Sequence, residues 1–284
     1  MGIIHRLGDG GCVLSYPLAS LSAMSSLAKS TLPSLIDTLG PLFEQTNTIV
    51  FFTGAGISTE SGIADFRSPG GIWSQIKPIQ YQDFLDDEAT RLEDWRRRFH
   101  FQAEFDAAPI NDGHRAVAAF MGQGAALITQ NIDGLHQRAC QELGIDDGGI
   151  VEIHGNGTRA ACLSCHAPHT LAYARQHIEE SGRSPRCTRC GGLVKASVIS
   201  FGQPMPQDRV QRAADLARAC DLFVVLGSSL VVQPAASLPA IARQAGAELV
   251  IINREETPLD SFASVTARVP IGTTMRSIRE YCGY

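Results

Sequence analysis

The sequence predicts an α/β protein built on a doubly wound parallel sheet. Short apolar runs rich in β-branched residues recur along the chain, and each ends in a polar or glycine-containing turn. The clearest runs span residues 49–52, 125–129, 221–226 and 248–252. Strands of a parallel sheet have this composition because helices cover both of its faces. Ligands of such sheets bind where the strands end, so we expect the site in these turns.

Composition is that of an ordinary globular protein. The chain has 284 residues, of which 44% are hydrophobic and 19% charged, with a net charge of −5. It has no long basic run, so nucleic acid is not expected as a partner, and the one basic cluster, residues 96–98, is interpreted as a solvated helix face. No apolar stretch reaches the ~18 residues that a membrane span needs, so no membrane partner is expected.

Residues 1–32 are predicted to form a disordered extension. They are rich in Gly, Ser, Ala and Leu and lack the charged-then-apolar order of a secretory signal. The alternative is an upstream start codon, with Met24 as the true beginning. We expect a cytoplasmic location, or a mitochondrial one if the extension is a transit peptide.

The first predicted helix and strand lead into a glycine turn. A helix is expected over residues 34–45, with a kink or break at Pro41. The strand over 49–52 then runs into Thr-Gly-Ala-Gly. Because Gly54 and Gly56 lack Cβ, the backbone can turn sharply and approach a phosphate closely. Ordinary tight turns use the same residues, so this pair alone is weak evidence.

The residues after the turn carry a family resemblance. Residues 54–67 read Gly-Ala-Gly-Ile-Ser-Thr-Glu-Ser-Gly-Ile-Ala-Asp-Phe-Arg. Here the chain resembles the sirtuin (Sir2) family of NAD-dependent protein deacylases, whose signature has Pro where Ala64 stands. The resemblance covers residues 35–284 and implies a Rossmann-like NAD-binding domain. It also implies these NAD contacts: Gly54, Ala55, Gly56, Ile63, Asp65, Phe66, Arg67, Gln130, Asn131, Asp133, Gly227, Ser228, Ser229, Asn253, Arg254, Glu255 and Ile271.

A second polar block follows the strand over 125–129. Residues 129–136 read Thr-Gln-Asn-Ile-Asp-Gly-Leu-His, which could be a plain polar loop with Asn and Asp as turn formers. The block also matches the second sirtuin signature without a gap. The resemblance gives Asn131 and Asp133 catalytic roles, since they would hold the nicotinamide ribose and carboxamide of NAD.

His154 is the candidate general base. A lone histidine is more often structural, but this one falls where the family keeps its base, just before a metal-binding pattern. An imidazole suits the role because its unperturbed pKa is ~6.5. His114 is expected to be a buried or capping residue and His136 a structural one.

Four cysteines predict a structural zinc site. Cys162 and Cys165 form one Cys-x-x-Cys pair and Cys187 and Cys190 another, with 21 residues between the pairs. Four thiolates would close a tetrahedral shell, so the zinc would not be the catalyst. Two disulfides are the alternative, which requires an oxidising compartment.

The segment after the second cysteine pair resembles the family's substrate strand, which binds the peptide by β-augmentation. The implied substrate contacts are Val198, Phe201, Gly202 and Val231. The resemblance also divides the chain. Residues 33–67, 110–155 and 194–284 would form the Rossmann-like domain, and the helical insert 68–109 and the zinc ribbon 156–193 the small domain.

The clearest helix of the insert spans residues 94–105. Relatives that prefer acidic acyl groups carry a Tyr-x-x-Arg pair on this helix, and alignment places Asp94 and Arg97 there. Desuccinylation is not expected, because Asp94 would repel the substrate. Looser similarity over residues 78–99 points to class II of the family.

We therefore expect an NAD-dependent lysine deacylase that acts on acyl-lysine proteins and releases nicotinamide and O-acyl-ADP-ribose. Mono-ADP-ribosyl transfer in the same cleft is the alternative that the sequence leaves open. A non-catalytic NAD-sensing module is disfavoured because His154 and Asn131 are both present. An NAD-linked dehydrogenase is disfavoured by the glycine pattern and the cysteine pairs. The acyl group and the oligomeric state do not follow from the sequence.

Overall fold

A parallel sheet forms the larger part of the molecule. The computed structural model describes residues 32–66, 71–72 and 76–284. The predicted extension, apart from its last residue, and Arg67 lie outside the described residues. Within them the sheet has six strands in the order β3-β2-β1-β7-β8-β9, all parallel. The strands are β1 (Ile49–Thr53), β2 (Ala126–Thr129), β3 (Val151–Glu152), β7 (Leu222–Leu226), β8 (Glu248–Ile252) and β9 (Val265–Ala267).

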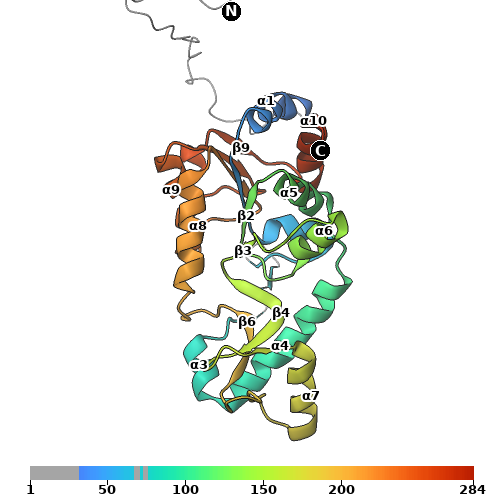
Figure 1. The fold of residues 1–284 in the computed structure, drawn as a ribbon, viewed down its shortest axis with the longest axis vertical. Helices are drawn as coiled ribbons and strands as arrows, with labels where there is room; N and C mark the ends of the chain where they lie inside the picture. The colour runs from blue at the N-terminus through green and yellow to red at the C-terminus, as the bar shows by residue number, and fades with distance from the viewer. Residues whose placement is uncertain (1–31, 67–70, 73–75) are drawn as a thin grey trace, which may run out of the picture.

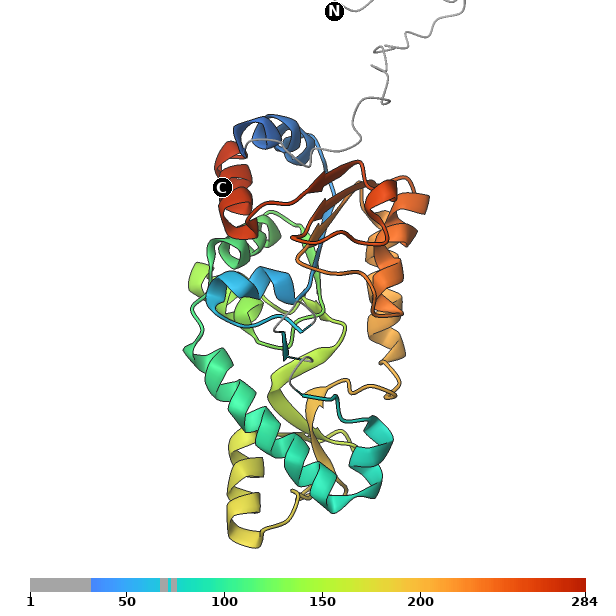
Figure 2. The same ribbon diagram turned by 180° about the vertical axis from the view of Figure 1, so that it is seen from behind.

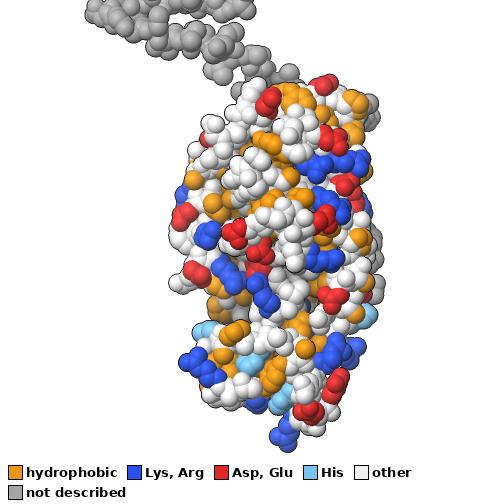
Figure 3. Space-filling view, turned by 45° about the vertical axis from the view of Figure 1, so that its right-hand side comes forward, with side chains coloured by type: hydrophobic (Ala, Val, Ile, Leu, Met, Phe, Trp, Pro, Cys, Tyr) orange, Lys and Arg blue, Asp and Glu red, His pale blue; other side chains and the backbone are white. Residues whose placement is uncertain are grey.

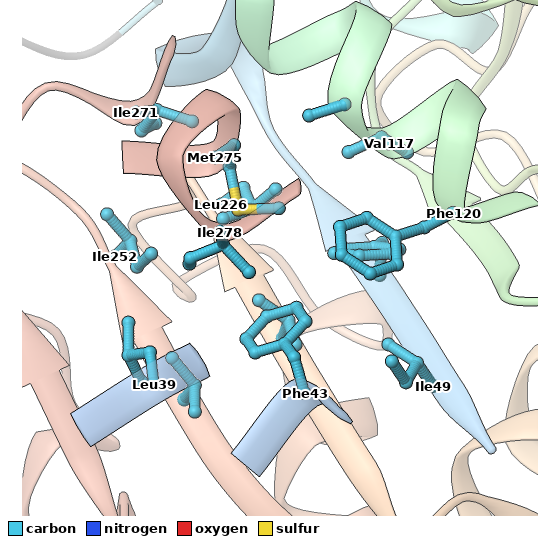
Figure 4. Packing of buried hydrophobic residues seen from close by; sticks show 14 of the residues in the cluster. Leu39, Phe43, Ile49, Val117, Phe120, Leu226, Ile252, Ile271, Met275 and Ile278 are labelled. Carbon is cyan, nitrogen blue, oxygen red and sulfur yellow. The ribbon is translucent and has the colours of Figure 1, made fainter. Parts of the chain in front are cut away.

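Helices cover both faces of this sheet. One face carries α1 (Leu32–Glu44), α5 (Asp112–Gly122) and α10 (Ile271–Tyr281); the other carries α8 (Gln207–Ala219), η3 (Ala235–Ser237) and α9 (Leu238–Gln244). Successive strand residues point to opposite faces, so Phe51 packs in the first layer and Phe52 in the second. Figure 4 shows the first layer, where the rings of Phe43 and Phe120 lie 5.5 Å apart over the strands. The predicted doubly wound α/β fold is confirmed.

Helix α1 continues through Pro41, so a break there is wrong, and a kink stays a prediction. A proline inside a helix removes one backbone hydrogen bond and costs about 3 kcal/mol. Leu35, Leu39 and Phe43 are nevertheless fully buried against the sheet. Each such side chain contributes about 2 kcal/mol when buried, which offsets the loss.

The smaller part of the molecule lies at the lower end in Figure 1. It contains the antiparallel sheet β5-β4-β6 and three helices. Its elements are α3 (Tyr81–Asp86), α4 (Glu88–Ala107), β4 (Gly155–Cys162), β5 (Pro168–His169), α7 (Leu171–Ser181) and β6 (Val194–Val198). Figure 2 shows α4 running diagonally from this end toward the large sheet. The division at residue 194 differs from the expectation: β6 pairs with β4, because the chain leaving the second cysteine pair returns antiparallel to the strand that led into the first.

Contacts between distant segments hold the small part together. The Glu88 carboxylate on α4 accepts hydrogen bonds from the backbone N–H and the hydroxyl of Ser184. Arg91 donates to the Ser184 hydroxyl as well, at 3.1 Å. Trp95 is fully buried in one cluster with Cys162 and Cys187. The helical segment and the cysteine-containing segment therefore share one core.

Two further observations concern charge and helix composition. On the face drawn in Figure 3, acidic and basic side chains are interspersed. Among the described residues, none of the helices combines the length and apolarity that a membrane crossing requires.

Candidate active site

The turns after β1 and β7 meet at the point where the strand order reverses. The chain forms β1, β2 and β3 on one side of this point and β7, β8 and β9 on the other, which is where ligands bind in open α/β sheets. The Gly56 N–H donates to the Gly227 carbonyl at 2.9 Å. Gly227 has a φ of +67°, and a Cβ added there would lie 2.4 Å from the Ile57 nitrogen. The glycines are thus required by the contact between the two turns, a reason that the sequence alone did not supply.

A cavity of about 860 Å³ opens beside these turns, a size typical of cofactor sites. Predicted residues that line it are Gly54, Ala55, Gly56, Asp65, Phe66, Gln130, Asn131, His154, Val198, Phe201, Gly202, Gly227, Ser228, Ser229, Val231, Asn253, Arg254, Glu255 and Ile271. They come from strand ends and loops more than 200 residues apart in sequence. The structure therefore brings nearly all of the predicted site together.

Asn131 is held by a buried hydrogen-bond network. Its side-chain amide donates to the Ser58 hydroxyl at 3.2 Å, and that hydroxyl donates to Asp133 Oδ2 at 2.7 Å. The other oxygen of Asp133 accepts the Leu135 N–H at 2.9 Å. Burial raises the pKa of Asp133 above its ordinary value. Asp133 stands behind Asn131, so it fixes the amide and does not itself line the cavity.

Two buried histidines support this network. The ring of His136 lies 4.9 Å from that of His114, edge to face. His136 Nε2 is 3.0 Å from the Thr53 hydroxyl, which donates to Thr129. Burial lowers the pKa of His136 to about 3 and holds that of His114 well below its ordinary value. His114 also closes a capping box with Asn111, so the expected structural roles of both rings are confirmed.

His154 is oriented for proton acceptance. Its Nδ1 lies 3.2 Å from the Gln130 carbonyl oxygen. A carbonyl can only accept, so Nδ1 carries a hydrogen. When the ring is neutral, Nε2 is then the nitrogen that can accept a proton. The Gln130 side chain in turn accepts a hydrogen bond from Ser228 at 2.6 Å. The ends of β2, β3 and β7 thereby fix one imidazole in one tautomer at the cavity wall.

Two exposed apolar side chains belong to the cavity wall. Phe201 is 40% exposed and Val231 is 50% exposed, and both line the cavity. The Phe201 carbonyl accepts the Tyr81 N–H at 2.8 Å, which ties this segment to α3. Large exposed apolar groups beside a cleft fit the stem of an aliphatic side chain.

The opposite end of the cavity lies beyond β8. Asn253 follows that strand, and its side-chain amide donates to the Glu255 carbonyl at 2.9 Å. Arg268, which the sequence did not single out, lines the same end and donates to the Asn253 carbonyl at 3.2 Å. Its ion pair with Asp260 fixes the guanidinium. This end therefore presents backbone and polar side-chain groups to a ligand.

The four predicted metal ligands converge in the small part. The sulfurs of Cys162, Cys165, Cys187 and Cys190 all lie within 4.8 Å of one another. Two pairs, Cys162 with Cys190 and Cys165 with Cys187, are 3.5 and 3.6 Å apart. Tetrahedral zinc with bonds of about 2.3 Å separates its sulfurs by about 3.8 Å, whereas a disulfide needs about 2.05 Å.

The thiols of this cluster differ in pKa. The backbone N–H groups of Cys165 and Ser164 lower the pKa of the Cys162 thiol to about 6, whereas the neighbouring thiols and burial raise that of Cys190. His169 Nε2 lies 3.3 Å from Cys187 Sγ, as a hydrogen-bond partner of a ligand rather than a fifth ligand. The cluster fits one structural zinc ion.

Comparison with known proteins identifies the family. A family model described as the Sir2 family matches residues 54–234. An NAD-dependent protein deacetylase of Rhodopseudomonas palustris is 47% identical over 247 residues, which cover 86% of this chain and 96% of that protein. NAD-dependent protein deacetylase 1 of Bradyrhizobium diazoefficiens is 48% identical over 251 residues, 88% of this chain and 97% of that one. The chain belongs to the Sir2 family.

Solved structures agree. A Sir2 structure with a p53 peptide and NAD⁺ is 35% identical, has a TM-score of 0.75 and covers 87% of this chain and 98% of that one. The predicted sirtuin resemblance is thereby confirmed, with its Rossmann-like sheet and cysteine module. Assignment to class II stays a prediction.

Two predicted NAD contacts do not reach the wall of this sirtuin cavity. Ile63 is 8% exposed and packs with Phe105 and Leu135 in a separate apolar cluster. Asp133 acts through Ser58, as described above. Arg67 lies outside the described residues.

Helix α4 forms one wall of the cavity. Asp94 and Arg97, which the resemblance placed beside the acyl group, line it together with Arg98 and Phe101, which the sequence did not single out. Asp94, Arg98 and Phe101 follow one another at spacings of four and three residues, which puts them on one helix face. The sequence shows that spacing but does not show that this face meets the cavity. The solvated interpretation of residues 96–98 holds for Arg96, whose side chain is 70% exposed; those of Arg97 and Arg98 are only 23% and 17% exposed.

Proposed function

We propose that this Sir2-family chain is an NAD-dependent protein-lysine deacylase. One observation carries the proposal: the His154 imidazole, whose Nδ1 lies 3.2 Å from the Gln130 carbonyl oxygen, lines the same cavity as the glycine turns and Asn131. NAD is a co-substrate that supplies an electrophilic ribose carbon and nicotinamide as the leaving group. The acyl-lysine supplies the carbonyl oxygen that attacks this carbon.

Each part of the site then has a task. The glycine turns and Ser228 lie where the two halves of the sheet meet and would hold the pyrophosphate and its ribose. Asn131 and Asp133 would orient the nicotinamide end, the second through Ser58. Phe201 and Val231 would enclose the lysine stem, with Val198 and Gly202 beside them. His154 would accept a proton from a ribose hydroxyl, after which that oxygen attacks the acyl carbon.

The reaction balances with water as the only reactant besides NAD and the acyl-lysine. The lysine amine is freed, nicotinamide leaves, and the acyl group ends on ADP-ribose as O-acyl-ADP-ribose. The four-cysteine site contributes structure and no step, because four thiolates leave no position for water on the metal.

The alternative of ADP-ribosyl transfer is not favoured, because the relatives of highest identity given above are named deacetylases. A cytoplasmic location and the absence of nucleic-acid and membrane partners stay predictions. Cell fractionation and binding assays test them.

The test is mass spectrometry of products formed from NAD and a panel of acetyl-, hydroxymethylglutaryl-, lipoyl- and myristoyl-lysine peptides. O-acyl-ADP-ribose that appears only when both NAD and an acyl peptide are present supports the proposal and ranks the acyl groups. No peptide turnover, with nicotinamide released only when protein acceptors are added, contradicts it.

A further inference from the structure

The chain passes from the large sheet to the small part at His154 itself. Strand β3 ends at Glu152 in the six-stranded sheet, and β4 begins at Gly155 in the three-stranded sheet (Figure 1). Ile153 and His154 are the two residues between these strands. The imidazole that lines the cavity therefore stands on a link between the two parts, and its position depends on how the two ends of that link are held.

The Glu152 carboxylate joins the two parts at this crossing. Its Oε1 accepts hydrogen bonds from the Gln137 amide, at 2.8 Å, and from the Asn156 amide, at 2.6 Å. Its Oε2 pairs with the Arg159 guanidinium. Gln137 belongs to α6 (Leu135–Leu143), which packs on α5 of the large part, whereas Asn156 and Arg159 belong to β4 of the small part.

These contacts require an ionised acceptor. The partners of Glu152 are two amide NH₂ groups and a guanidinium, all of which donate. A carboxylate accepts from all of them, whereas a carboxamide in its place would turn its own hydrogens toward another donor. The Glu152 side chain is only 12% exposed, so water is a poor substitute for the lost bonds.

Asn156 carries this tie into the backbone of β4. Its side chain is buried, and its amide oxygen accepts the N–H and the hydroxyl of Thr158, at 2.8 and 2.6 Å. The pairing of β4 with β6 shifts register between Gly155 and Ala160, so no regular ladder fixes these residues. The carboxylate thus helps to hold the segment that directly follows His154.

Backbone hydrogen bonds fasten the two ends of the crossing. The Glu152 carbonyl accepts from Arg209 of α8 at 3.1 Å. The His154 carbonyl accepts the N–H of Ile199, the residue after β6, at 2.9 Å. One end is therefore attached to the large part and the other to the small part. The carboxylate sets how the two ends lie relative to each other, and the ring between them follows.

We propose that Glu152 is a positioning residue for the His154 base, which it holds through the crossing without touching the substrate. The inference rests on the proposed deacylase function. In that reaction nicotinamide leaves before His154 accepts a proton from the ribose. A displaced imidazole therefore impairs the second half of the reaction and spares the first.

The first half can be measured by itself because it is reversible. Free nicotinamide re-forms the bond from its ring nitrogen to the ribose carbon and expels the acyl oxygen, which restores NAD and the acyl-lysine. Labelled nicotinamide therefore enters NAD without the help of His154. The ratio of this exchange to lysine release reports on the base alone, since poor folding or poor NAD binding lowers both rates together.

The experiment measures both rates on one acetyl-lysine peptide. Glu152→Gln should lower lysine release about 10²-fold, the loss expected from a misplacement of ~1 Å, and should leave nicotinamide exchange near the wild-type rate. The ratio of exchange to lysine release then rises by the same factor. Lysine release at the wild-type rate overturns the proposal, and so does an equal fall of both rates.

A second variant guards against misfolding of Glu152→Gln. Gln137→Met combined with Arg159→Met removes two of the donors at a half-buried and an exposed position. The ratio should rise about tenfold, the value of one hydrogen bond to a charged group. A wild-type ratio in this double variant overturns the proposal even if Glu152→Gln fails to fold.

Glu142→Gln is the matched control. Glu142 lies on α6 and pairs with Arg115 at 2.7 Å, away from the crossing. Both rates should stay at their wild-type values in this variant. The wild-type protein separates the two levels of inference. Lysine release with an unchanged ratio in all variants rejects the positioning role and leaves the deacylase intact, whereas a wild-type protein that neither frees lysine nor exchanges nicotinamide rejects both.

Discussion

The two sides of the cavity hold their polar groups in different ways. On the side of the large sheet, short hydrogen bonds join the Asn131 amide through Ser58 to Asp133, although His136 Nδ1 behind them has no partner in the described part of the chain. On the side of α4, a carboxylate and a guanidinium meet at 3.6 Å, and each keeps one buried atom without a partner among the described residues. Hydrogen bonds therefore fix the amide on the sheet side, whereas one long contact holds the charged pair on α4.

The same contrast separates how the two parts of the molecule are stabilised. The large sheet buries two continuous apolar layers, one on each face. The small part has one cluster, and Cys162 and Cys187 are members of it. Its core therefore depends on the metal that the cysteines hold, whereas the core of the sheet does not.

Replacing a zinc ligand should have the largest effect. Cys187→Ser leaves three thiolates, and structural zinc contributes about 10–16 kcal/mol to small metal-dependent folds. We expect zinc to fall from one ion per chain to none and the small part to unfold, with loss of deacylation. Elemental analysis and activity assays measure both. Cys282→Ser, a half-buried cysteine outside the cluster, should keep its zinc. A folded, active and zinc-free Cys187→Ser protein would sink the structural-metal assignment.

Removing the imidazole should stop the chemistry and leave the fold. His154→Tyr is expected to lower kcat about 10²–10⁴-fold, the range for loss of a general base, with zinc content and melting temperature unchanged. His100→Gln, at an exposed position of α4, is the control and should keep kcat. Wild-type turnover by His154→Tyr would show that another group accepts the proton.

A methyl group added at Gly227, where the turns after β1 and β7 meet, should lower stability and weaken NAD binding. Gly227→Ala places Cβ 2.4 Å from the Ile57 nitrogen at a φ of +67°. Strain at positive φ costs about 1–2 kcal/mol, and overpacking adds about 1–3 kcal/mol. Denaturant unfolding and NAD titration measure the two consequences, lower stability and weaker NAD binding.

Gly144→Ala is the matched control for this change. Gly144 has the same φ of +67° with nothing within 4 Å of the added Cβ. Gly144→Ala should lower stability only by the backbone strain of about 1–2 kcal/mol and should keep its NAD affinity. Equal loss in the two variants would mean that the contact between the turns is not essential.

The buried histidines should make stability depend on pH. The pKa of His136 is about 3 in the folded protein, against 6.5 for an ordinary histidine. Between these values the unfolded chain binds one more proton at this site, so the free energy of unfolding falls as pH drops from about 6.5 toward 3. His136→Gln should remove up to about 1.4 kcal/mol per pH unit from this slope. Urea unfolding at pH 5 and 6 measures it.

Exposed His100 again serves as the reference. His100→Gln should keep the wild-type slope, because its ring is solvated and its pair with Glu104 is on the surface. If His136→Gln also kept the wild-type dependence of the unfolding free energy on pH, the pKa of His136 would be the same in the folded and the unfolded protein, which contradicts the prediction.

The sequence could predict those parts of the site that short local patterns encode. The strand ends carry short local patterns, such as residues 54–66 and 129–136, because a buried strand must deliver its turn at one edge of the sheet. Those patterns located Asn131, His154 and the glycine turns. The cysteine spacing likewise located the metal ligands.

The remaining features depend on packing that no local pattern records. Which face of α4 meets the cavity is decided by Trp95, buried among the cysteines. That placement turns Asp94 and Arg98 inward, whereas residues 96–98 resemble any exposed basic run. Asp133 and Ile63 match the family signatures, yet only the tertiary structure shows that they stand behind the wall. Pro41 is tolerated for the same reason, since burial of its neighbours decides the helix.

The central claim is that deacylation consumes NAD in step with the acyl-lysine. The most direct measurement counts nicotinamide released and lysine freed in the same reaction on an acetylated peptide, with wild-type protein. We predict one nicotinamide per lysine and none without the acetyl group. Lysine freed without nicotinamide, or nicotinamide released at an equal rate from the unacetylated peptide, would contradict the account.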